Sequence, residues 1–328
     1  MKIHDEVGNI FRKGGEFLIT THLNPDGDAV GSLLGLGLAL KKLDKKVELI
    51  SPHPLSESYQ FLPGSELIQL PCNLKKIHFE IAVVLDCTEL NRTGKDLEDI
   101  LKKCKTVINI DHHISNTGFG SINVVDPGAA ATGELVFEIL VGMGVQITPD
   151  IATNLYFALV TDTGFFQYQN TTPRCHRTGA SLLEYGATQR KIHQFLNENR
   201  SLTSIHLLGK SLGTLSVSES GLVAWMTVSQ QFLREVGGKI EDCEGFINYP
   251  KSLAGVEVGI LFKELENNEI KVGFRSKKFL DVNQLAACFG GGGHERAAGC
   301  TVRGHLKEVE RKVIQATEQF LTRGGGGN

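Results

Sequence analysis

Short apolar runs alternate with stretches of helical periodicity along the first 195 residues of the chain. Several apolar runs are continuous, as at Ile81–Leu85, which is typical of strands in a parallel sheet covered on both faces. Alternation of such strands with helices predicts an α/β fold with a mostly parallel open sheet and helices on both faces. The expected strands are Glu16–Thr21, Lys46–Ile50, Ile81–Leu85, Thr106–Ile110 and Ile122–Val125. The expected helices are Gly31–Leu43, Lys95–Lys103, Thr132–Met143, Asp150–Val160 and Pro173–Tyr185.

The pattern changes after residue 210, where strand-like segments are separated by turns. Val256–Phe262 and Ile270–Phe274 flank a polar turn, which is a hairpin signal. A helix is expected from Asp281, which begins a capping-box pattern, and a last amphipathic helix over His305–Leu321. We therefore predict a smaller second α/β domain with a mixed sheet. The expected division is a catalytic domain at 1–187, a helical linker at 188–209, a substrate-binding domain at 210–323 and a flexible tail at 324–328.

Composition narrows the class of protein. The 328 residues carry a formal net charge of −3, whereas proteins that coat long nucleic acids usually carry a basic excess. The N-terminus lacks the apolar core of a signal peptide, and no apolar run reaches the roughly eighteen residues of a membrane span. The seven cysteines include no C-x-x-C pair, which favours free thiols in a reducing compartment. We expect a cytoplasmic protein with neither a membrane nor a long nucleic acid as its partner.

Side chains of metal-ligand type follow three of the expected strands. The stretch His22–Asp28 follows the first strand, Asp86 the third and Asp111–His113 the fourth. Because ligands of open α/β folds gather beyond the carboxyl ends of the strands, we expect these clusters to meet. Asp162 ends an apolar helical run, where the helix dipole disfavours a carboxylate and therefore suggests a compensating cation.

Each cluster alone has a structural alternative: an Asx-rich turn that caps a helix, a polar strand end, or simple surface exposure.

Mixed oxygen and imidazole ligands suit Mn²⁺ best, with Mg²⁺, Fe²⁺ or Co²⁺ as alternatives. Two ions about 3.5–4 Å apart would activate a bridging hydroxide for the hydrolysis of a phosphoester. Asp26 and Asp28 could each face a different ion. The six candidate metal ligands are His22, Asp26, Asp28, Asp86, His112 and Asp162.

Candidate substrate contacts lie mainly in the second domain. The glycine run at 290–293 would let backbone N–H groups approach an anion, and His294 follows it directly; the alternative is a flexible linker. Arg275 and Ser276 end an expected strand with a guanidinium and a hydroxyl, which suit a phosphate, although a surface ion pair explains Arg275 nearly as well. In the first domain, Arg92 could offer a planar fork to a phosphate or be a solvated surface residue.

Taken together, these motifs resemble those of the DHH phosphoesterase superfamily. The order H-x-x-P-D-G-D, D, D-H-H and T-D-T-G matches at residues 22–28, 86, 111–113 and 161–164. The segment at 291–299 is similar to the G-G-G-H-x-x-A-A-G signature of the DHH-associated C-terminal domain. The arrangement is most similar to the stand-alone bacterial nanoRNase / pAp phosphatase branch of the family. These are cytoplasmic, Mn²⁺-dependent enzymes that degrade very short RNAs and remove the 3′-phosphate of pAp.

The resemblance implies a role for each residue. His113 would meet the scissile phosphate, and Asp111 would orient an imidazole. The substrate, a short oligoribonucleotide or nucleotide, would lie between the domains. A homodimer is also expected. One metal would be held by His22, Asp26 and Asp86, and the other by Asp28, Asp86, His112 and Asp162. The substrate's phosphate or terminal nucleotide would contact Gly291, Gly292, Gly293 and His294.

Other activities remain open on the same first domain. Hydrolysis of linear or cyclic dinucleotides needs the same metal ligands. A manganese-dependent inorganic pyrophosphatase also opens on the motif found at His22–Asp26, although the glycine run with His294 argues against it. A RecJ-type single-strand exonuclease would need an additional nucleic-acid-binding domain. A non-catalytic nucleotide-binding regulator would be expected to lack a metal ligand, and no ligand position of the motif is missing here.

Overall fold

A computed structural model of the protein describes residues 2–74, 78–198 and 200–324. The chain divides into two compact units, Met1–Asn199 and Arg200–Asn328, each of which has its own sheet. The division falls inside the segment expected to be a linker, 188–209. Of the expected tail, Gly324 is the last residue of helix α12, and residues 325–328 lie outside the described residues. Among the described residues, no helix combines the length and apolar character needed to cross a bilayer.

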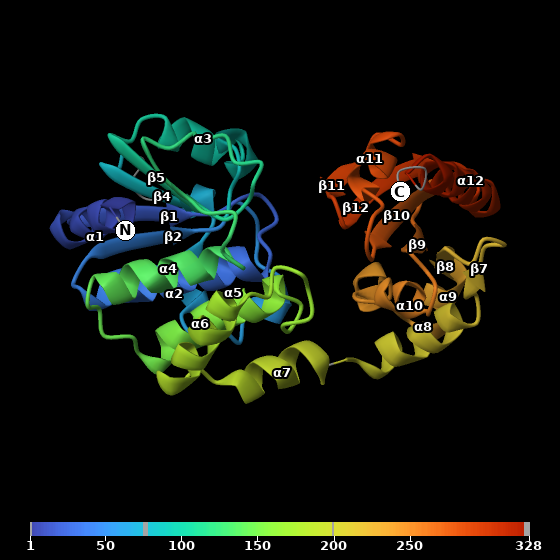
Figure 1. The fold of residues 1–328 in the computed structure, drawn as a ribbon, viewed down its shortest axis with the longest axis horizontal. Helices are drawn as coiled ribbons and strands as arrows, with labels where there is room; N and C mark the ends of the chain where they lie inside the picture. The colour runs from blue at the N-terminus through green and yellow to red at the C-terminus, as the bar shows by residue number, and fades with distance from the viewer. Residues whose placement is uncertain (1, 75–77, 199, 325–328) are drawn as a thin grey trace. The chain divides into compact units, whose positions relative to one another are not determined.

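Unit 1 is built on a six-stranded sheet in the order β3-β2-β1-β4-β5-β6 (Figure 1). Every neighbouring pair is parallel, as the continuous apolar runs predicted. The extra strand, β3, has only two residues and is too short to leave a pattern in the sequence. The strands are β1 Glu16–Thr20, β2 Lys46–Ile50, β3 Ile68–Gln69, β4 Ile81–Leu85, β5 Thr106–Asp111 and β6 Ile122–Val125.

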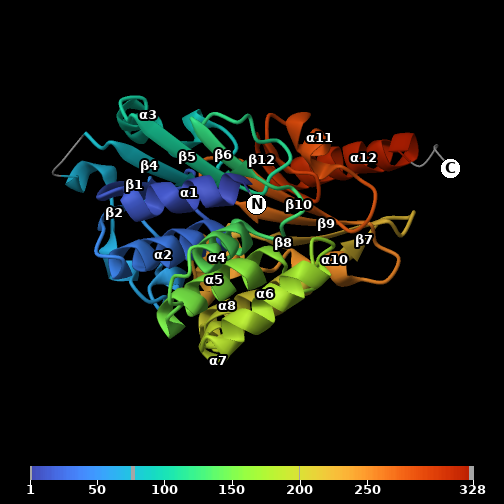
Figure 2. The ribbon, with the colours of Figure 1, turned by 60° about the vertical axis from the view of Figure 1, so that its left-hand side comes forward.

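Helices cover both faces of this sheet (Figure 2). Alternate residues of β1 show the division: Phe17 and Ile19 pack with α1, α2, α4 and α5, whereas Leu18 packs in a second cluster with α3. Helix α1 was not predicted, although it buries Val7 and Phe11 completely. The helices are α1 Lys2–Lys13, α2 Gly27–Lys42, α3 Lys95–Leu101, α4 Thr132–Gly142, α5 Pro149–Asp162, α6 Pro173–Glu184 and α7 Gln189–Asn197. Single 3₁₀ turns lie at Glu57–Tyr59, Ser65–Leu67, Pro71–Asn73 and Leu90–Thr93.

Helix α2 begins four residues earlier than the sequence suggested. The carboxylate of Asp26 caps the helix by accepting the N–H of Ala29 at 3.1 Å. Asp28 consequently lies in the first helical turn and not in a loop. Farther along, α2 packs closely on α5, because Gly31 has no side chain: a Cβ there would be 2.5 Å from the carbonyl oxygen of Asn154.

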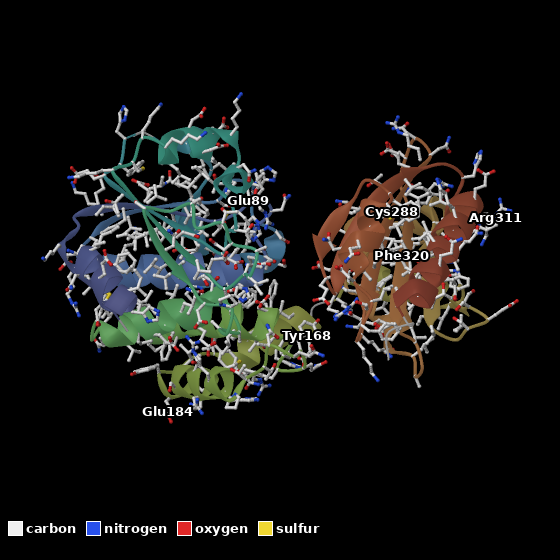
Figure 3. The ribbon with its side chains drawn as sticks, turned by 45° about the horizontal axis from the view of Figure 1, so that its top comes forward. Glu89, Tyr168, Glu184, Cys288, Arg311 and Phe320 are labelled. Carbon is white, nitrogen blue, oxygen red and sulfur yellow. The ribbon has the colours of Figure 1, made fainter. Side chains whose placement is uncertain are left out.

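Unit 2 contains a second six-stranded sheet, in the order β11-β12-β10-β9-β8-β7. The β8–β9 pair is parallel and the other pairs are antiparallel, so this sheet is mixed, as expected. Figure 3 shows Phe320 on α12, whose inner face packs on the core of this unit. The strands are β7 Ser216–Val217, β8 Val223–Val228, β9 Val258–Glu264, β10 Glu269–Ser276, β11 Gly292–His294 and β12 Ala297–Arg303. The helices are α8 Leu202–Leu212, α9 Gln230–Val236, α10 Asn248–Ser252, α11 Val282–Ala287 and α12 Leu306–Gly324, with a 3₁₀ turn at Ile240–Cys243.

Candidate metal centre

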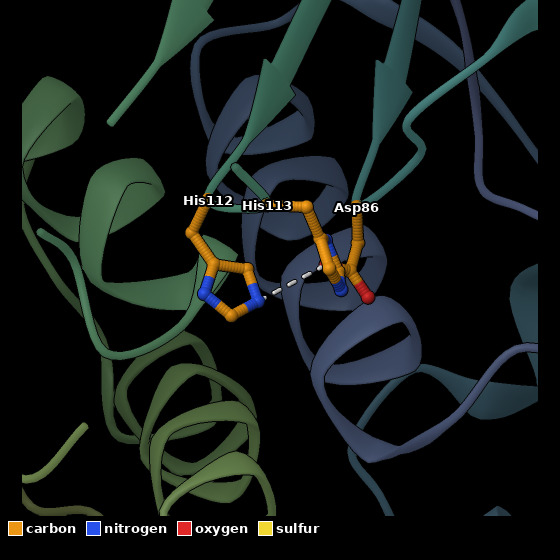
Figure 4. Close-up of side chains that lie close together, drawn as sticks. All are labelled: Asp86, His112 and His113. Carbon is orange, nitrogen blue, oxygen red and sulfur yellow. Dashed lines mark ion pairs between the residues drawn. The ribbon is translucent and has the colours of Figure 1, made fainter. Parts of the chain in front are cut away.

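The carboxyl ends of three neighbouring strands meet at one edge of the unit 1 sheet. Strand β4 lies between β1 and β5, so the residues that follow these strands come together around Asp86. Nε2 of His22 is 3.6 Å from Oδ2 of Asp86. Nε2 of His112 is 3.6 Å from Oδ1 of the same carboxylate, and Figure 4 shows both side chains reaching inward from the ends of their strands. Asp86 itself is buried and has a positive φ of 55°, which is tolerated better by Asp than by most residues.

Two helices bring further carboxylates to His112. Asp28 lies in the first turn of α2 and Asp162 is the last residue of α5. Their Oδ2 atoms are 3.7 Å and 3.6 Å from Nε2 of His112. The structure thus contains three overlapping groups of potential ligand atoms, each within 4.8 Å: His22, Asp26 and Asp86; Asp28, His112 and Asp162; and Asp86, His112 and His113.

The orientation of His22 suits metal ligation. Its Nδ1 lies 2.7 Å from the carbonyl oxygen of Leu23, so Nδ1 carries the proton that it donates there. The lone pair is therefore on Nε2, the nitrogen that faces Asp86. Metal-bound histidines almost always donate their second ring N–H in this way, because the bond fixes the tautomer and the plane of the ring.

The electrostatics of the cluster also favour bound cations. Burial raises the pKa of Asp28 well above its ordinary value, and the charges of Asp86 and Asp162 raise it further. Burial is also the main cause that raises the pKa of Asp162 to about 6. For Asp86, burial acts in the same direction, but the hydrogen bond with His22 and the charges of the neighbouring imidazoles outweigh it and lower the pKa. Crowded buried carboxylates of this kind can all remain ionised when cations lie between them.

Asp111 is the nearest carboxylate to the His113 ring: Nδ1 of His113 is 2.7 Å from Oδ1 of Asp111 and 3.6 Å from Oδ1 of Asp86. Nδ1 of His113 donates to Oδ1 of Asp111 at 2.7 Å, which fixes the orientation of the ring. Burial lowers the pKa of His113, but the bond to Asp111 and the surrounding carboxylates outweigh it and raise the pKa to about 9. The same Oδ1 accepts the backbone N–H groups of His112 and His113 at 2.8 Å and 3.2 Å. Asp111 therefore orients the second motif histidine.

The loop that follows Asp162 is conformationally strained. Phe165 and Phe166 have positive φ values of 59° and 62°, which are rare for bulky side chains and cost on the order of 1–3 kcal/mol each. The loop is tied back to the centre by Asn170, whose Nδ2 donates to Oδ2 of Asp162 at 3.1 Å. Figure 3 shows Tyr168 on this loop, where half of its surface is exposed.

Sequence comparison identifies the family to which these features belong. The profile of the DHH family, N-terminal domain, matches residues 16–159, and that of the DHHA1 domain matches residues 223–323. The bifunctional oligoribonuclease and PAP phosphatase NrnA of Thermus thermophilus is 36% identical over 313 residues, which are 95% of this chain and 92% of that protein. The chain belongs to the DHH family.

Two further relatives of this DHH protein agree with that assignment. The NrnA of Bacillus subtilis, which has the same descriptive name, is 26% identical over 288 residues, or 87% of this chain and 88% of that one. The crystal structure of an exopolyphosphatase-related protein from Bacteroides fragilis superposes with a TM-score of 0.90 at 28% identity. It covers 98% of this chain and 96% of the other, so the resemblance and the fold class expected from the sequence are both confirmed.

Arg92 is attached to the same edge of the DHH domain through its backbone. Its carbonyl oxygen accepts the N–H of Leu23 at 2.6 Å, and its Nη1 donates to Oγ1 of Thr88 at 3.3 Å. The side chain is exposed. The guanidinium therefore lies on a segment bonded to the residue after His22, but none of the three ligand groups includes it.

In the DHHA1 domain, Arg275 and Ser276 lie on opposite faces of the sheet. Side chains alternate along β10, and Ser276 shares the buried face with Phe274. The two predicted contacts therefore do not line one surface side by side. Oγ of Ser276 has no hydrogen-bond partner among the described residues, whereas Nη1 of Arg275 donates to the carbonyl of Phe274 at 3.0 Å.

The glycine run is a hairpin, and this corrects the expected cradle of N–H groups. Gly292–His294 form strand β11, which pairs with β12. The N–H groups of Gly290 and Gly291 donate to carbonyls of α11, and that of Gly293 donates to Oδ1 of Asn283 at 2.9 Å. These three groups are therefore not open to an anion. Glycine is needed at 291 for another reason, since a Cβ there would collide with the backbone of β12.

Several uncharged side chains near the centre were missed at the level of the sequence. Asn116 donates from Nδ2 to Oδ2 of Asp111 at 2.6 Å, and Ser32 donates to Oδ1 of Asp28 at 3.0 Å. Asn170, described above, does the same for Asp162. Asn116 follows the D-H-H motif by three positions and could have been suspected on that ground. The other two positions carry no signal that distinguishes them from ordinary polar residues.

Proposed function

We propose that this chain is a metal-dependent phosphoric ester hydrolase that degrades very short oligoribonucleotides and removes the 3′-phosphate of pAp. The observation that carries the proposal is the set of overlapping ligand groups around Asp86 at the edge of the sheet. The substrates are suggested by the names of the relatives from T. thermophilus and B. subtilis, both described as bifunctional oligoribonuclease and PAP phosphatase.

The proposed cofactor is a pair of divalent cations, with Mn²⁺ favoured by the mixture of carboxylate and imidazole ligands. Such a pair supplies Lewis acidity and lowers the pKa of water near a phosphate. Asp86 is the proposed shared ligand, because it belongs to two of the three groups. The first ion would be held by His22, Asp26 and Asp86, and the second by Asp28, Asp86, His112 and Asp162.

His113 is proposed to contact the scissile phosphate. The bond from Nδ1 to Asp111 orients the ring, and the raised pKa of His113 favours the cationic form, which attracts an anion. Arg92 is a second candidate phosphate contact in the same domain. In the DHHA1 domain, Arg275 and His294 remain proposed contacts of the nucleotide end of the substrate.

The decisive experiment offers four substrates side by side in Mn²⁺: a diribonucleotide, pAp, inorganic pyrophosphate and a cyclic dinucleotide. We expect turnover of the first two. Turnover of pyrophosphate alone would identify a pyrophosphatase, and a strong preference for the cyclic dinucleotide would identify the other alternative. Either result would contradict the proposal.

The same assay tests the role of Asp86. Asp86→Ala removes a ligand from both proposed ions, so Mn²⁺-dependent turnover should be lost. The control is Asp126→Asn, which changes a carboxylate directly after the edge strand β6 of the same sheet, where it pairs with Arg174 outside the centre. This control should retain its turnover. Full activity of Asp86→Ala would refute the shared-ligand assignment.

A further inference from the structure

The N-terminus of α4 bonds to two of the proposed metal ligands at once. The N–H of Thr132 donates to Oδ2 of Asp28 at 2.6 Å, and the N–H of Gly133 donates to Oδ1 at 2.9 Å. The hydroxyl of Thr132 donates to Oδ1 of Asp86 at 3.0 Å. Thr132 is fully buried. One residue therefore links a carboxylate of α2 with a carboxylate at the end of β4.

Asp28 takes the place of a helix cap. The first N–H groups of a helix have no partner within it, and Ala131, at the N-cap of α4, has no side chain that could accept them. The carboxylate of Asp28, which is 104 positions away from Thr132 in sequence, accepts these groups instead. The helix dipole favours a negative charge at this end. The contact therefore favours a negative charge on Asp28.

The same bonds determine which lone pairs remain for a cation. Oδ1 of Asp28 already accepts two donors, the N–H of Gly133 and the hydroxyl of Ser32. A carboxylate oxygen offers about two lone-pair sites, so Oδ1 has less capacity left for a cation than Oδ2. Oδ2 accepts only Thr132 among the described residues, and it is the oxygen 3.7 Å from Nε2 of His112. The remaining lone pair of Oδ2 therefore lies on the side of the group formed by Asp28, His112 and Asp162.

The close approach of α4 requires a small residue next to Thr132. A Cβ at Gly133 would be 2.6 Å from the Cβ of Ala158 and 3.3 Å from Oγ of Ser32. The β-branched side chain of Thr132 is stiff about χ1, which suits a hydroxyl that must point at one acceptor.

We propose that Thr132 is the positioning residue of the centre. Its N–H and hydroxyl hold Asp28 and Asp86 in the orientation in which both face His112, and they thereby set the affinity of this group for its cation. The inference rests on the proposed function, because it assumes that these carboxylates bind a divalent metal. Side chains that orient metal ligands typically change metal affinity about 10- to 100-fold when they are removed.

The test compares Thr132→Val, which keeps the shape and the N–H but removes the hydroxyl, with Thr132→Ser, which keeps the hydroxyl. Thr178→Val is the matched control, since Thr178 is also buried and donates its hydroxyl to a carboxylate, that of Glu134, outside the centre. Binding of Mn²⁺ to metal-free protein is measured by titration calorimetry. We expect about 10- to 100-fold weaker binding at one site in Thr132→Val, with near wild-type binding in the serine variant and in the control.

Two results would overturn the inference: unchanged Mn²⁺ binding by Thr132→Val, or equal loss in the valine and serine variants, which would indicate a packing role for the methyl group. If Thr132→Val does not fold, Thr132→Ala removes the same hydroxyl without adding bulk and is expected to give the same loss. A wild-type protein that binds no Mn²⁺ would contradict the proposed function itself, so the two failures are distinguishable.

Discussion

Asp111→Asn tests whether the charge behind His113 matters for turnover. Asp111 is fully buried and accepts four hydrogen bonds: three at Oδ1, and at Oδ2 the bond from Asn116. The amide oxygen of the variant must take the position of Oδ1, because an NH₂ group there would face two backbone N–H groups. His113 therefore keeps its Nδ1–H donor bond but loses a charged acceptor. The new NH₂ group meets the NH₂ group of Asn116.

The expected fall in kcat follows from the change in these hydrogen bonds. A hydrogen bond to a charged group contributes about 1.5–3 kcal/mol and one between neutral groups about 1 kcal/mol. The hydrogen bond that orients His113 is therefore weakened by roughly 1–2 kcal/mol in the variant. Since about 1.4 kcal/mol corresponds to a tenfold change in rate, kcat should fall about 5- to 30-fold. KM should change little, because Asp111 is buried behind His113 and is not a proposed contact of the substrate. Asn116 retains the carbonyl of Cys87 and Oδ1 of Asn109 as acceptors, so the protein should still fold.

The assay is steady-state cleavage of a diribonucleotide at saturating Mn²⁺, with Mn²⁺ binding measured separately. Asp126→Asn again serves as the control, because it makes the same chemical change at the end of the next strand. Wild-type kcat in Asp111→Asn would refute the orienting role. Loss of Mn²⁺ binding together with kcat would show that Asp111 acts through the metal ligands and not through His113.

Two predictions concern stability. Gly31→Ala places a Cβ 2.5 Å from the carbonyl oxygen of Asn154 and should lower the free energy of unfolding by about 1–3 kcal/mol. Gly15→Ala, whose Cβ would have nothing within 4 Å, should leave the free energy of unfolding unchanged. Chemical denaturation measures both variants, and equal midpoints would contradict the packing argument. The hydrogen bond from Arg174 lowers the pKa of Asp126, so its stabilisation is present above the ordinary value of 3.8 and is lost as the pH falls through the lowered value. Asp126→Asn should therefore melt below wild type at pH 7, and this difference should shrink as the pH falls below 3.8 and vanish below the lowered pKa of Asp126. A difference independent of pH would exclude this ion pair as the cause.

The sequence was sufficient for the longer strands of the unit 1 sheet and for the positions of the candidate ligands. Buried parallel strands are continuous apolar runs, and the ends of β1, β4 and β5 must lie at one edge of a parallel sheet. That rule predicted that His22, Asp86 and His112 would be neighbours before the order of the strands was known. The small elements were not predictable in this way, because a two-residue strand such as β3 has no periodicity.

The sequence did not predict which residues donate hydrogen bonds to the candidate ligands. Thr132 and Asn170 are ordinary polar residues by composition, and their partners are defined only by how α4 and the loop after α5 pack. The same limit explains the errors in the DHHA1 domain. The glycine run suggested open N–H groups, but the hairpin and α11 occupy them. Adjacent positions suggested a shared site for Arg275 and Ser276, but the pleat of β10 separates their side chains.

The separation of Asp26 and Asp28 into two groups of potential ligands has a conformational cause that only the structure reveals. Asp26 is the N-cap of α2 and has an extended backbone, with φ −88° and ψ −167°, whereas Asp28 is already helical. The two side chains therefore leave the backbone in different directions, one toward His22 and Asp86 and the other toward His112 and Asp162. A loop would not impose this divergence. The residue between them must also be glycine, because a Cβ at Gly27 would be 2.5 Å from Oγ1 of Thr161 on α5, the helix that carries Asp162. The start of α2 thus both separates the two carboxylates and allows α5 to bring its own carboxylate to the centre.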